Sequence, residues 1–188
     1  MAKKMAFDLS KEVLNAAQAL FMADGYEAVG MRDIAKQLGK HPTQIYRLKL
    51  SKSDILAELI LRLNQEQIDR VPELRARVIG NTPFERTCSY LEALYVSDIQ
   101  HLPIRSVGAA FGWLWSADYE RKVIEQVFEL IKPIVGWMQE AGLEDIQPRC
   151  LGIWSLYYVG YRHAVMQEGS AAECLATIRP SLRFYFAA

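Results

Sequence analysis

The sequence predicts an all-α fold, with a small N-terminal unit of three helices followed by a larger helical domain. Three observations support this prediction. Apolar residues recur at helical spacing along most of the 188-residue chain. Helix-start signals are frequent, and the clearest are Thr82-Pro83-Phe84-Glu85 and Ser170-Ala171-Ala172-Glu173. The stretch from Gly30 to Lys52 has the pattern of two short helices joined by a tight turn.

The first helix is expected to start at Ser10, which can serve as its N-cap, and to stop at Gly25. Its apolar face would consist of Val13, Leu14, Ala17, Leu20 and Phe21, which follow one another at helical spacing. This helix would be the third member of a small bundle formed with the two helices that come after it. Tyr26 could fill the core beneath them or contact a DNA phosphate, and the core is the expected role.

The next two helices are predicted between Gly30 and Lys52. Gly30 would be the N-cap of a helix that starts at Met31, and Gly39 would take the left-handed backbone conformation of the turn. His41-Pro42 restarts the chain as a helix. Ile45 would face the core, and the outer side would carry four residues, Thr43, Gln44, Tyr46 and Arg47. In a helix-turn-helix this outer side enters the major groove of DNA.

Positive charge is concentrated in the same stretch. Between Asp33 and Asp54 there is no acidic residue, and there are five basic ones, Lys36, Lys40, Arg47, Lys49 and Lys52. The whole chain has 22 basic and 22 acidic residues, yet residues 1–54 carry a net charge of +3 and residues 55–188 a net charge of −3. This is the charge pattern expected for contact with DNA phosphates at the N-terminal end.

These motifs resemble those of the TetR/AcrR family of transcriptional repressors over about the first 60 residues. The motifs are Phe21-x-x-x-Gly25-Tyr26, Met31-Arg32-Asp33-Ile34-Ala35, Leu38-Gly39, Ile45-Tyr46-Arg47 and Ser51-Lys52-x-Asp54-Ile55-Leu56. The resemblance implies a helix-turn-helix DNA-binding domain at residues 1–52 and a helical effector-binding and dimerisation domain at residues 53–188. It also implies a sequence-specific transcriptional regulator, most simply a repressor.

The chain departs from the usual pattern of this family at four places, one of which is a pair of residues. Lys40 stands where valine or isoleucine is usual, and Thr43 where glycine or alanine is frequent. Val29-Gly30 replaces a threonine and a hydroxyl-bearing N-cap. Lys49 replaces an apolar residue that packs the reading helix onto the next helix, and we expect Leu48 or Leu50 to take over that packing.

The residues predicted to bind DNA are Gly30, Arg32, His41, Thr43, Gln44, Tyr46, Arg47 and Lys52. Gln44 could make paired hydrogen bonds to an adenine in the major groove. Tyr46 and Lys52 match family positions that contact phosphates. His41 could instead cap the reading helix, and any exposed side chain in this set could simply be solvated.

The larger domain is rich in aromatic residues that could line a cavity for a small, largely apolar or aromatic effector. The candidates are Tyr90, Tyr95, Phe111, Trp113, Trp115, Phe128, Tyr157 and His163. Core packing is the alternative role for each of them. Long helices are expected from Ser53 to about Val71, from Thr82 to about Pro103, and from Ser116 to Gly142, with a shorter buried helix between Ile104 and Trp115.

The last two helices are expected at Pro148–Glu168 and Ser170–Phe186. The first of them has apolar residues on two sides, and a helix with two apolar stripes must bury both. The resemblance implies that these helices pair with those of a second subunit as a four-helix bundle. The residues predicted for this homodimer interface are Ile153, Tyr157, Gly160, Ala164, Ile178 and Leu182.

Little in the sequence points to catalysis. Cys88, Cys150 and Cys174 are widely separated and have no metal-ligand spacing, and no carboxylate pair or nucleophile constellation stands out. We therefore expect no enzyme activity, no metal and no cofactor. The odd number of cysteines, with no signal peptide and no long apolar run, favours the cytoplasm over a membrane.

The expected partners are a palindromic or near-palindromic double-stranded DNA operator, a small-molecule effector and a second copy of the chain. Two other functions stay open. One is a helical interaction protein that has lost base reading, because Lys40, Thr43 and Lys49 depart from the family pattern. The other is a helical enzyme whose basic N-terminal unit binds a phosphorylated substrate.

Overall fold

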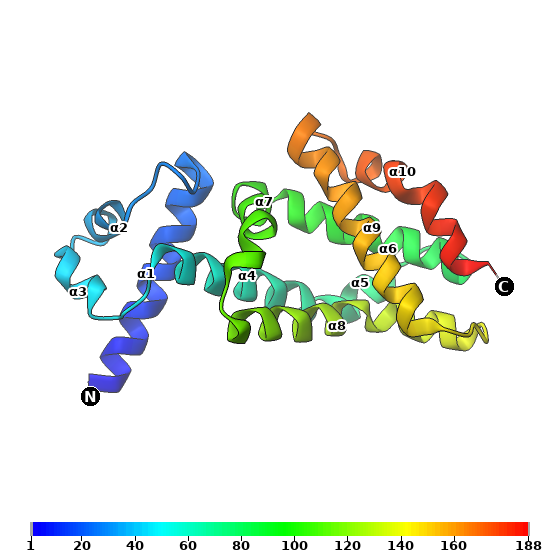
Figure 1. The fold of residues 1–188 in the computed structure, drawn as a ribbon, viewed down its shortest axis with the longest axis horizontal. Coiled ribbons are helices and arrows are strands. Elements are labelled where there is room, and N and C mark those ends of the chain that lie inside the picture. Colours follow the sequence, from blue (N-terminus) through cyan, green and yellow to red (C-terminus); the bar gives the residue numbers. More distant parts are fainter. Residues whose placement is uncertain (1, 188) are drawn as a thin grey trace. The chain divides into compact units, whose positions relative to one another are not determined.

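The computed structural model describes residues 2–187, apart from the side chains of residues 2–8 and of Trp113. This described part is helical and contains no strand (Figure 1), so the predicted all-α class is confirmed. In order the helices are α1 (Ala2–Asp24), α2 (Met31–Gln37), α3 (Pro42–Tyr46), α4 (Lys52–Asp69), α5 (Val71–Arg77), α6 (Pro83–Ile99), α7 (Leu102–Phe111), η1 (Gly112–Leu114), α8 (Ala117–Glu140), α9 (Ile146–Gln167), α10 (Ala171–Leu182) and η2 (Arg183–Phe186).

The chain folds as two compact units. The first unit consists of Met1–Leu63 and His101–Val123, and the second of Asn64–Gln100 and Ile124–Ala188. These units do not divide at residue 52. The assignment of DNA binding to residues 1–52 and of effector binding and dimerisation to residues 53–188 stays a prediction.

The core of the first unit is built by α1, α2, α3, the start of α4 and α7. Its fully buried side chains include Val13, Ala17, Phe21, Ile34, Ile45, Ile55, Leu59 and Ile104. Val13, Ala17 and Phe21 belong to the apolar face predicted for the first helix. Gly108 of α7 allows a close contact with α4, because a Cβ atom there would lie 2.5 Å from Cδ1 of Ile60.

Most helix ends in the first unit lie at or next to the residues that the sequence signals predicted. Gly25 and Gly39 have φ angles of 82° and 62°, so both occupy the left-handed region that favours glycine. Three predicted starts are wrong, and one of them is that of α7, which begins at Leu102 instead of Ile104. The first helix begins at Ala2 instead of Ser10, because the residues before Ser10 include good helix formers. The fourth begins at Lys52, since Ser51 acts as its cap and donates its hydroxyl to Asp54 Oδ2 at 2.7 Å.

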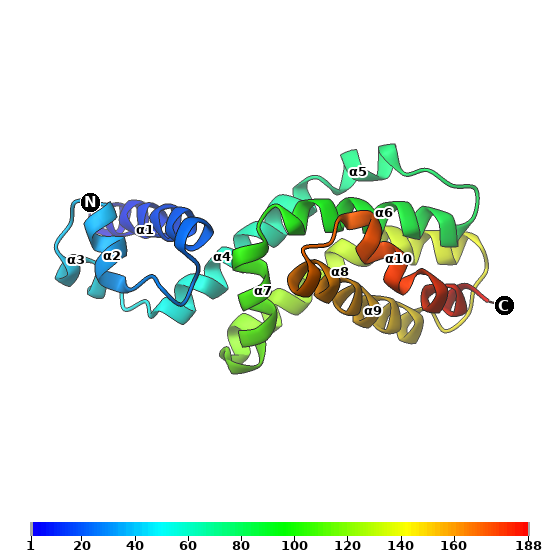
Figure 2. The ribbon, with the colours of Figure 1, turned by 90° about the horizontal axis from the view of Figure 1, so that it is seen from above.

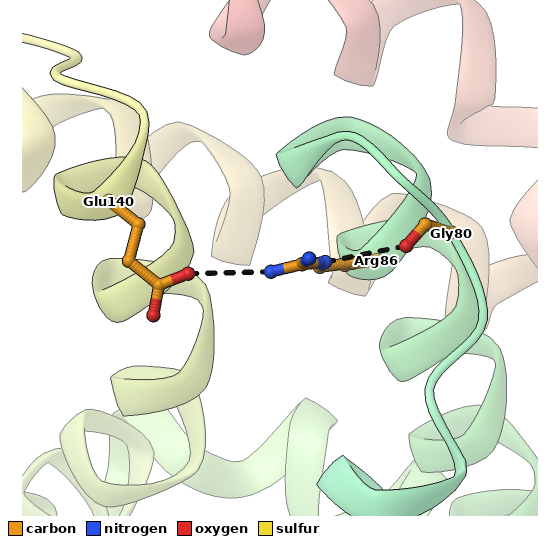
Figure 3. A network of polar contacts seen from close by, with 3 residues as sticks. All are labelled: Gly80, Arg86 and Glu140. Atoms are coloured by element: carbon orange, nitrogen blue, oxygen red, sulfur yellow. Dashed lines mark hydrogen bonds and ion pairs between the residues drawn. The ribbon is translucent and has the colours of Figure 1, made fainter.

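The second unit packs α10 against both α9 and α6, and α5 also contacts α6 (Figures 1 and 2). Tyr90 of α6 donates a hydrogen bond to the carbonyl oxygen of Leu130 in α8 at 2.8 Å. Arg86 forms a second link between these helices, because its guanidinium lies 3.3 Å from Glu140 and also donates to the carbonyl oxygen of Gly80 (Figure 3). These contacts hold α6 at the centre of the unit.

Candidate nucleic-acid interface

The reading helix α3 is held by apolar contacts on its inner side. Ile45 is fully buried in the core of the first unit, and Leu48 and Leu50 are half-buried and pack against the same core. Both leucines therefore take over the packing for which Lys49 is unsuited, as expected. Lys49 itself is exposed and has a φ angle of 55°, so the chain turns outward between the two leucines.

The outer side of α3 is open to solvent. Thr43, Gln44 and Arg47 are exposed, and so is 53% of Tyr46. This placement agrees with the predicted outer side of a reading helix. The contacts of these residues with DNA stay a prediction.

The start of α3 is closed by a network among three side chains. The backbone N–H of His41 donates to Oε1 of Gln44 at 3.0 Å, and the backbone N–H of Thr43 donates to Nδ1 of His41 at 3.4 Å. The same ring nitrogen lies 2.9 Å from Oγ1 of Thr43. Since Nδ1 must be the acceptor for the Thr43 N–H, the Thr43 hydroxyl donates to it as well. His41 and Gln44 thus form a capping box.

The other predicted DNA-binding residues lie around this helix. Gly30 caps α2, where its N–H donates to Asp33 Oδ2 at 2.8 Å, and Arg32 is exposed on the first turn of α2. The Lys52 ammonium lies 4.1 Å from the centroid of the Tyr26 ring and donates to the carbonyl oxygen of Glu27 at 3.5 Å. Its position is therefore set by Tyr26, which is buried in the core as predicted.

Two further electrostatic features complete this surface. Lys40, which departs from the family pattern, forms an ion pair of 3.2 Å with Glu12 of α1, so its charge is partly compensated within the protein. Burial raises the pKa of the Tyr26 phenol, and the nearby carboxylate of Glu27 raises it further. The Tyr26 phenol therefore stays neutral, and the positive charge of the interface comes from Arg32, Lys36, Arg47, Lys49 and Lys52.

The predicted effector residues are divided between the two units. Tyr90, Tyr95 and Tyr157 lie buried in the second unit, where the rings of Tyr95 and Tyr157 stack with centroids 4.2 Å apart. Phe128 is 54% exposed, and His163 is half-buried beside Gly169. Phe111 and Trp115 pack against the core of the first unit instead, and the side chain of Trp113 lies outside the described part of the chain.

The sequence-based predictions missed two residues beside this aromatic group. Trp154 extends the stack, because its ring centroid lies 5.1 Å from that of Tyr157. Asp98 is buried and accepts hydrogen bonds from Nε2 of Gln67 at 2.6 Å and from the hydroxyl of Tyr157 at 2.8 Å. Its spacing of three and four residues from Tyr95 and Leu94 places it on the apolar face of α6, and this spacing was the available signal.

The residues predicted for a dimer interface lie inside one chain. All six, Ile153, Tyr157, Gly160, Ala164, Ile178 and Leu182, are buried in the second unit by packing among α6, α9 and α10. They are not available to a second copy in this structure. The opposite side of α9 exposes Leu151, Tyr158, Val159, Val165 and Met166.

Among the described residues, no group of three or more histidine, cysteine, aspartate or glutamate side chains could hold a metal ion. The three cysteines are free and buried. None of the described helices has the length and apolar character needed to cross a bilayer.

The reading helix α3 is short and exposed, and the buried Ile45 anchors it to the core. It is preceded by α2 and by the turn at Gly39. This arrangement defines a helix-turn-helix DNA-binding protein. Residues 13–59 match the family model described as bacterial regulatory proteins, tetR family. Residues 13–59 thus match this family, and the chain as a whole has the fold of its transcriptional regulators, which confirms the resemblance seen in the motifs. Regulators of this family bind DNA and are not enzymes.

Solved structures of this family align with nearly the whole chain. A TetR/AcrR-family regulator from Thermobifida fusca is 21% identical, with 93% of this chain and 96% of that chain covered and a TM-score of 0.66. A TetR regulator from Haloarcula marismortui is 19% identical, with 95% and 96% covered and a TM-score of 0.67. The regulator FadR from Bacillus subtilis, in complex with stearoyl-CoA, is 18% identical, with 92% and 96% covered and a TM-score of 0.67. A search of curated protein sequences found no significant match.

Proposed function

We propose that this TetR-family regulator is a homodimeric repressor that binds a near-palindromic DNA operator and is released by a small, largely apolar or aromatic effector. The outer side of α3 carries the DNA-binding part of the proposal. Thr43, Gln44 and Arg47 are exposed there, while Ile45 fixes the helix from its inner side. A helix held in this way can enter the major groove without losing its own packing.

The charge around α3 supports the same function. Exposed Arg32, Lys36, Arg47 and Lys49 lie on or next to the two short helices, and the Lys52 ammonium is held beside the Tyr26 ring at the start of α4. Cations in such positions attract DNA phosphates and orient the reading helix, although they carry no sequence information.

The exposed side of α9 supports a homodimer. Leu151, Tyr158 and Val165 follow each other at seven-residue spacing, and Leu151 and Met166 are 69% and 72% exposed. An apolar stripe of this length on a surface is typical of an interface between proteins. A second copy would cover the stripe and hold two reading helices about 34–36 Å apart, which calls for an operator with two-fold symmetry.

The second unit supports an apolar or aromatic effector. The Tyr95, Tyr157 and Trp154 rings stack in its interior, and the buried Asp98 and Gln67 provide polar contacts beside them. Stearoyl-CoA, bound to the similar FadR, has a long apolar chain. An effector that binds more tightly to a conformation with another spacing of the reading helices would release the operator. The DNA target and the free, buried cysteines favour the cytoplasm as the location.

Selection of bound sites from random duplex DNA is the decisive experiment. We expect enrichment of a sequence with two-fold symmetry, bound at about 0.15 M salt against excess competitor DNA. A helical interaction protein without base reading would enrich no sequence.

Sedimentation tests the dimer. Val159→Glu should shift the protein toward monomers, because Val159 lies on the exposed side of α9. A wild type that is monomeric at micromolar concentration would contradict the dimer.

A further inference from the structure

The roles of the side chains on α3 can be divided by the direction in which each one points. An α-helix turns by about 100° per residue, so Arg47 lies about 200° and Thr43 about 160° around the helix axis from the buried Ile45. These two side chains are therefore the ones most nearly opposite the core. Gln44 and Tyr46 flank them, each about 100° from Ile45.

Gln44 is already engaged in the structure of the reading helix. Its Oε1 atom accepts the backbone N–H of His41 at 3.0 Å, and this bond is half of the capping box. Reading an adenine requires both the amide oxygen and the amide nitrogen of a glutamine at once. The oxygen keeps a second lone pair, but while it accepts the His41 N–H the Gln44 side chain is folded back over the first turn of a five-residue helix, so extending it toward a base would weaken the cap.

Thr43 is engaged as well, because its hydroxyl bonds to Nδ1 of His41 at 2.9 Å. Its hydroxyl proton is therefore in use, which leaves the hydroxyl oxygen as an acceptor and the methyl group for contact with DNA. Arg47 differs from both, since it is exposed and, within the described part of the chain, its guanidinium makes no hydrogen bond or ion pair. A free guanidinium opposite the anchored side of a reading helix can bond both O6 and N7 of a guanine.

On the basis of the proposed function, we infer that Arg47 specifies a guanine in each half-site and that Gln44 is a positioning residue that holds the start of the reading helix. The His41, Thr43 and Gln44 network fixes the first turn of α3. Arg47, at its end, then contacts the base edge from a fixed backbone. This assigns base discrimination to the residue that has no role inside the protein.

Two conservative variants test the inference by selection of bound sites and by affinity for the selected operator. Arg47→Lys keeps the positive charge and loses the bidentate fork. It should weaken the preference for guanine at one base pair per half-site, with discrimination falling by a factor of about 10, because a lysine reaches O6 and N7 only as a point charge, while the dependence of affinity on salt stays unchanged. Gln44→Glu keeps an oxygen that can accept the His41 N–H. It should bind all sequences more weakly and select the same sequence as the wild type.

The opposite results would overturn the inference. If Gln44→Glu lost an adenine or gained a cytosine at one position, Gln44 would be the base-reading residue, because glutamate accepts from cytosine and cannot donate to adenine. If Arg47→Lys selected the wild-type sequence with unchanged discrimination, Arg47 would contact only phosphates. In both cases the proposed function would stand. A wild type that selects no sequence would instead overturn the proposed function, and this inference with it.

Discussion

Tyr95 of α6 contacts Tyr157 of α9 in two ways at once: its hydroxyl donates to the carbonyl oxygen of Tyr157 at 2.8 Å, and the two rings stack with 5° between their planes. Gly160 makes room for this arrangement. A Cβ atom there would lie 2.2 Å from the Tyr95 hydroxyl oxygen and 2.7 Å from the carbonyl oxygen of Cys174 in α10. One small residue therefore sets the distance between α9 and both of its neighbours.

Gly160→Ala should destabilise the protein by about 1–3 kcal/mol, because the added methyl group displaces Tyr95 or the α10 backbone. Gly136→Ala is a matched control, since Gly136 also lies in a helix and a Cβ atom there would meet no atom within 4 Å. It should stabilise the protein by about 0.5–1 kcal/mol through helix propensity. Urea denaturation followed by circular dichroism measures both, and equal effects of the two variants would contradict the packing role of Gly160.

Stability should fall as the pH rises above about 10. Burial raises the pKa of the Tyr90 and Tyr95 phenols well above their ordinary value of 10.0. The unfolded chain loses these protons near pH 10 and the folded chain keeps them, so each further pH unit lowers the free energy of unfolding by about 1.4 kcal/mol per tyrosine. The thiols of the buried cysteines act in the same direction, because burial raises their pKa values as well.

The Tyr95→Phe variant measures how much one phenol contributes to the loss of stability at high pH. The variant should lose less stability between pH 10 and pH 11 than the wild type, by about 1 kcal/mol, because the phenol of the unfolded chain is only half ionised at pH 10. Tyr46→Phe is the control, because Tyr46 is exposed. Urea midpoints at several pH values measure the difference. A slope that is the same in the wild type and in Tyr95→Phe would show that this phenol ionises equally in the folded and unfolded chains.

Lys49 allows a test of backbone strain at the end of the reading helix. Its φ angle of 55° lies in the left-handed region, which costs a non-glycine residue about 1 kcal/mol. Lys49→Gly should therefore be more stable than Lys49→Gln by up to about 1 kcal/mol. Both variants lose the same charge, so they should lose affinity for DNA equally if Lys49 contacts a phosphate. A glycine variant less stable than the glutamine variant would mean that the turn is not strained.

Much of the fold follows from local sequence signals. Gly39 occupies the left-handed turn between α2 and α3, and Thr82 and Ser170 each form a capping box at the start of a helix. Such signals depend on a few neighbouring residues, which is why they can be identified without a structure.

The sequence did not predict which helices, far apart in the chain, pack against each other. The apolar residues of α7 indicated a buried helix, but not that Gly108 would pack against Ile60 of α4. Likewise, helical spacing identified two stripes on α9, but not which one faces α6 and α10. The capping role of Gln44 was predictable, because His41-x-x-Gln44 has the spacing of a capping box, and the interpretation as a base-reading residue overlooked it.

Lys52→Ala should weaken binding to the operator and to random DNA alike, because phosphate contacts carry affinity without sequence information. The Lys52 ammonium is held 4.1 Å from the Tyr26 ring centroid, so its position at the start of α4 is set before DNA arrives. Losing it should flatten the slope of log K against log salt by about 0.9 for each half-site.

Tyr46→Phe should have a milder effect on both duplexes and leave the slope unchanged, since it removes a neutral hydroxyl. Lys132→Ala removes the same charge from α8, where Lys132 pairs with Glu129, and serves as the control. Salt titrations of the three variants on operator and scrambled duplexes measure these effects. If Lys52→Ala and Lys132→Ala gave the same slope, Lys52 would have no phosphate contact, and its ammonium would serve only to cover Tyr26.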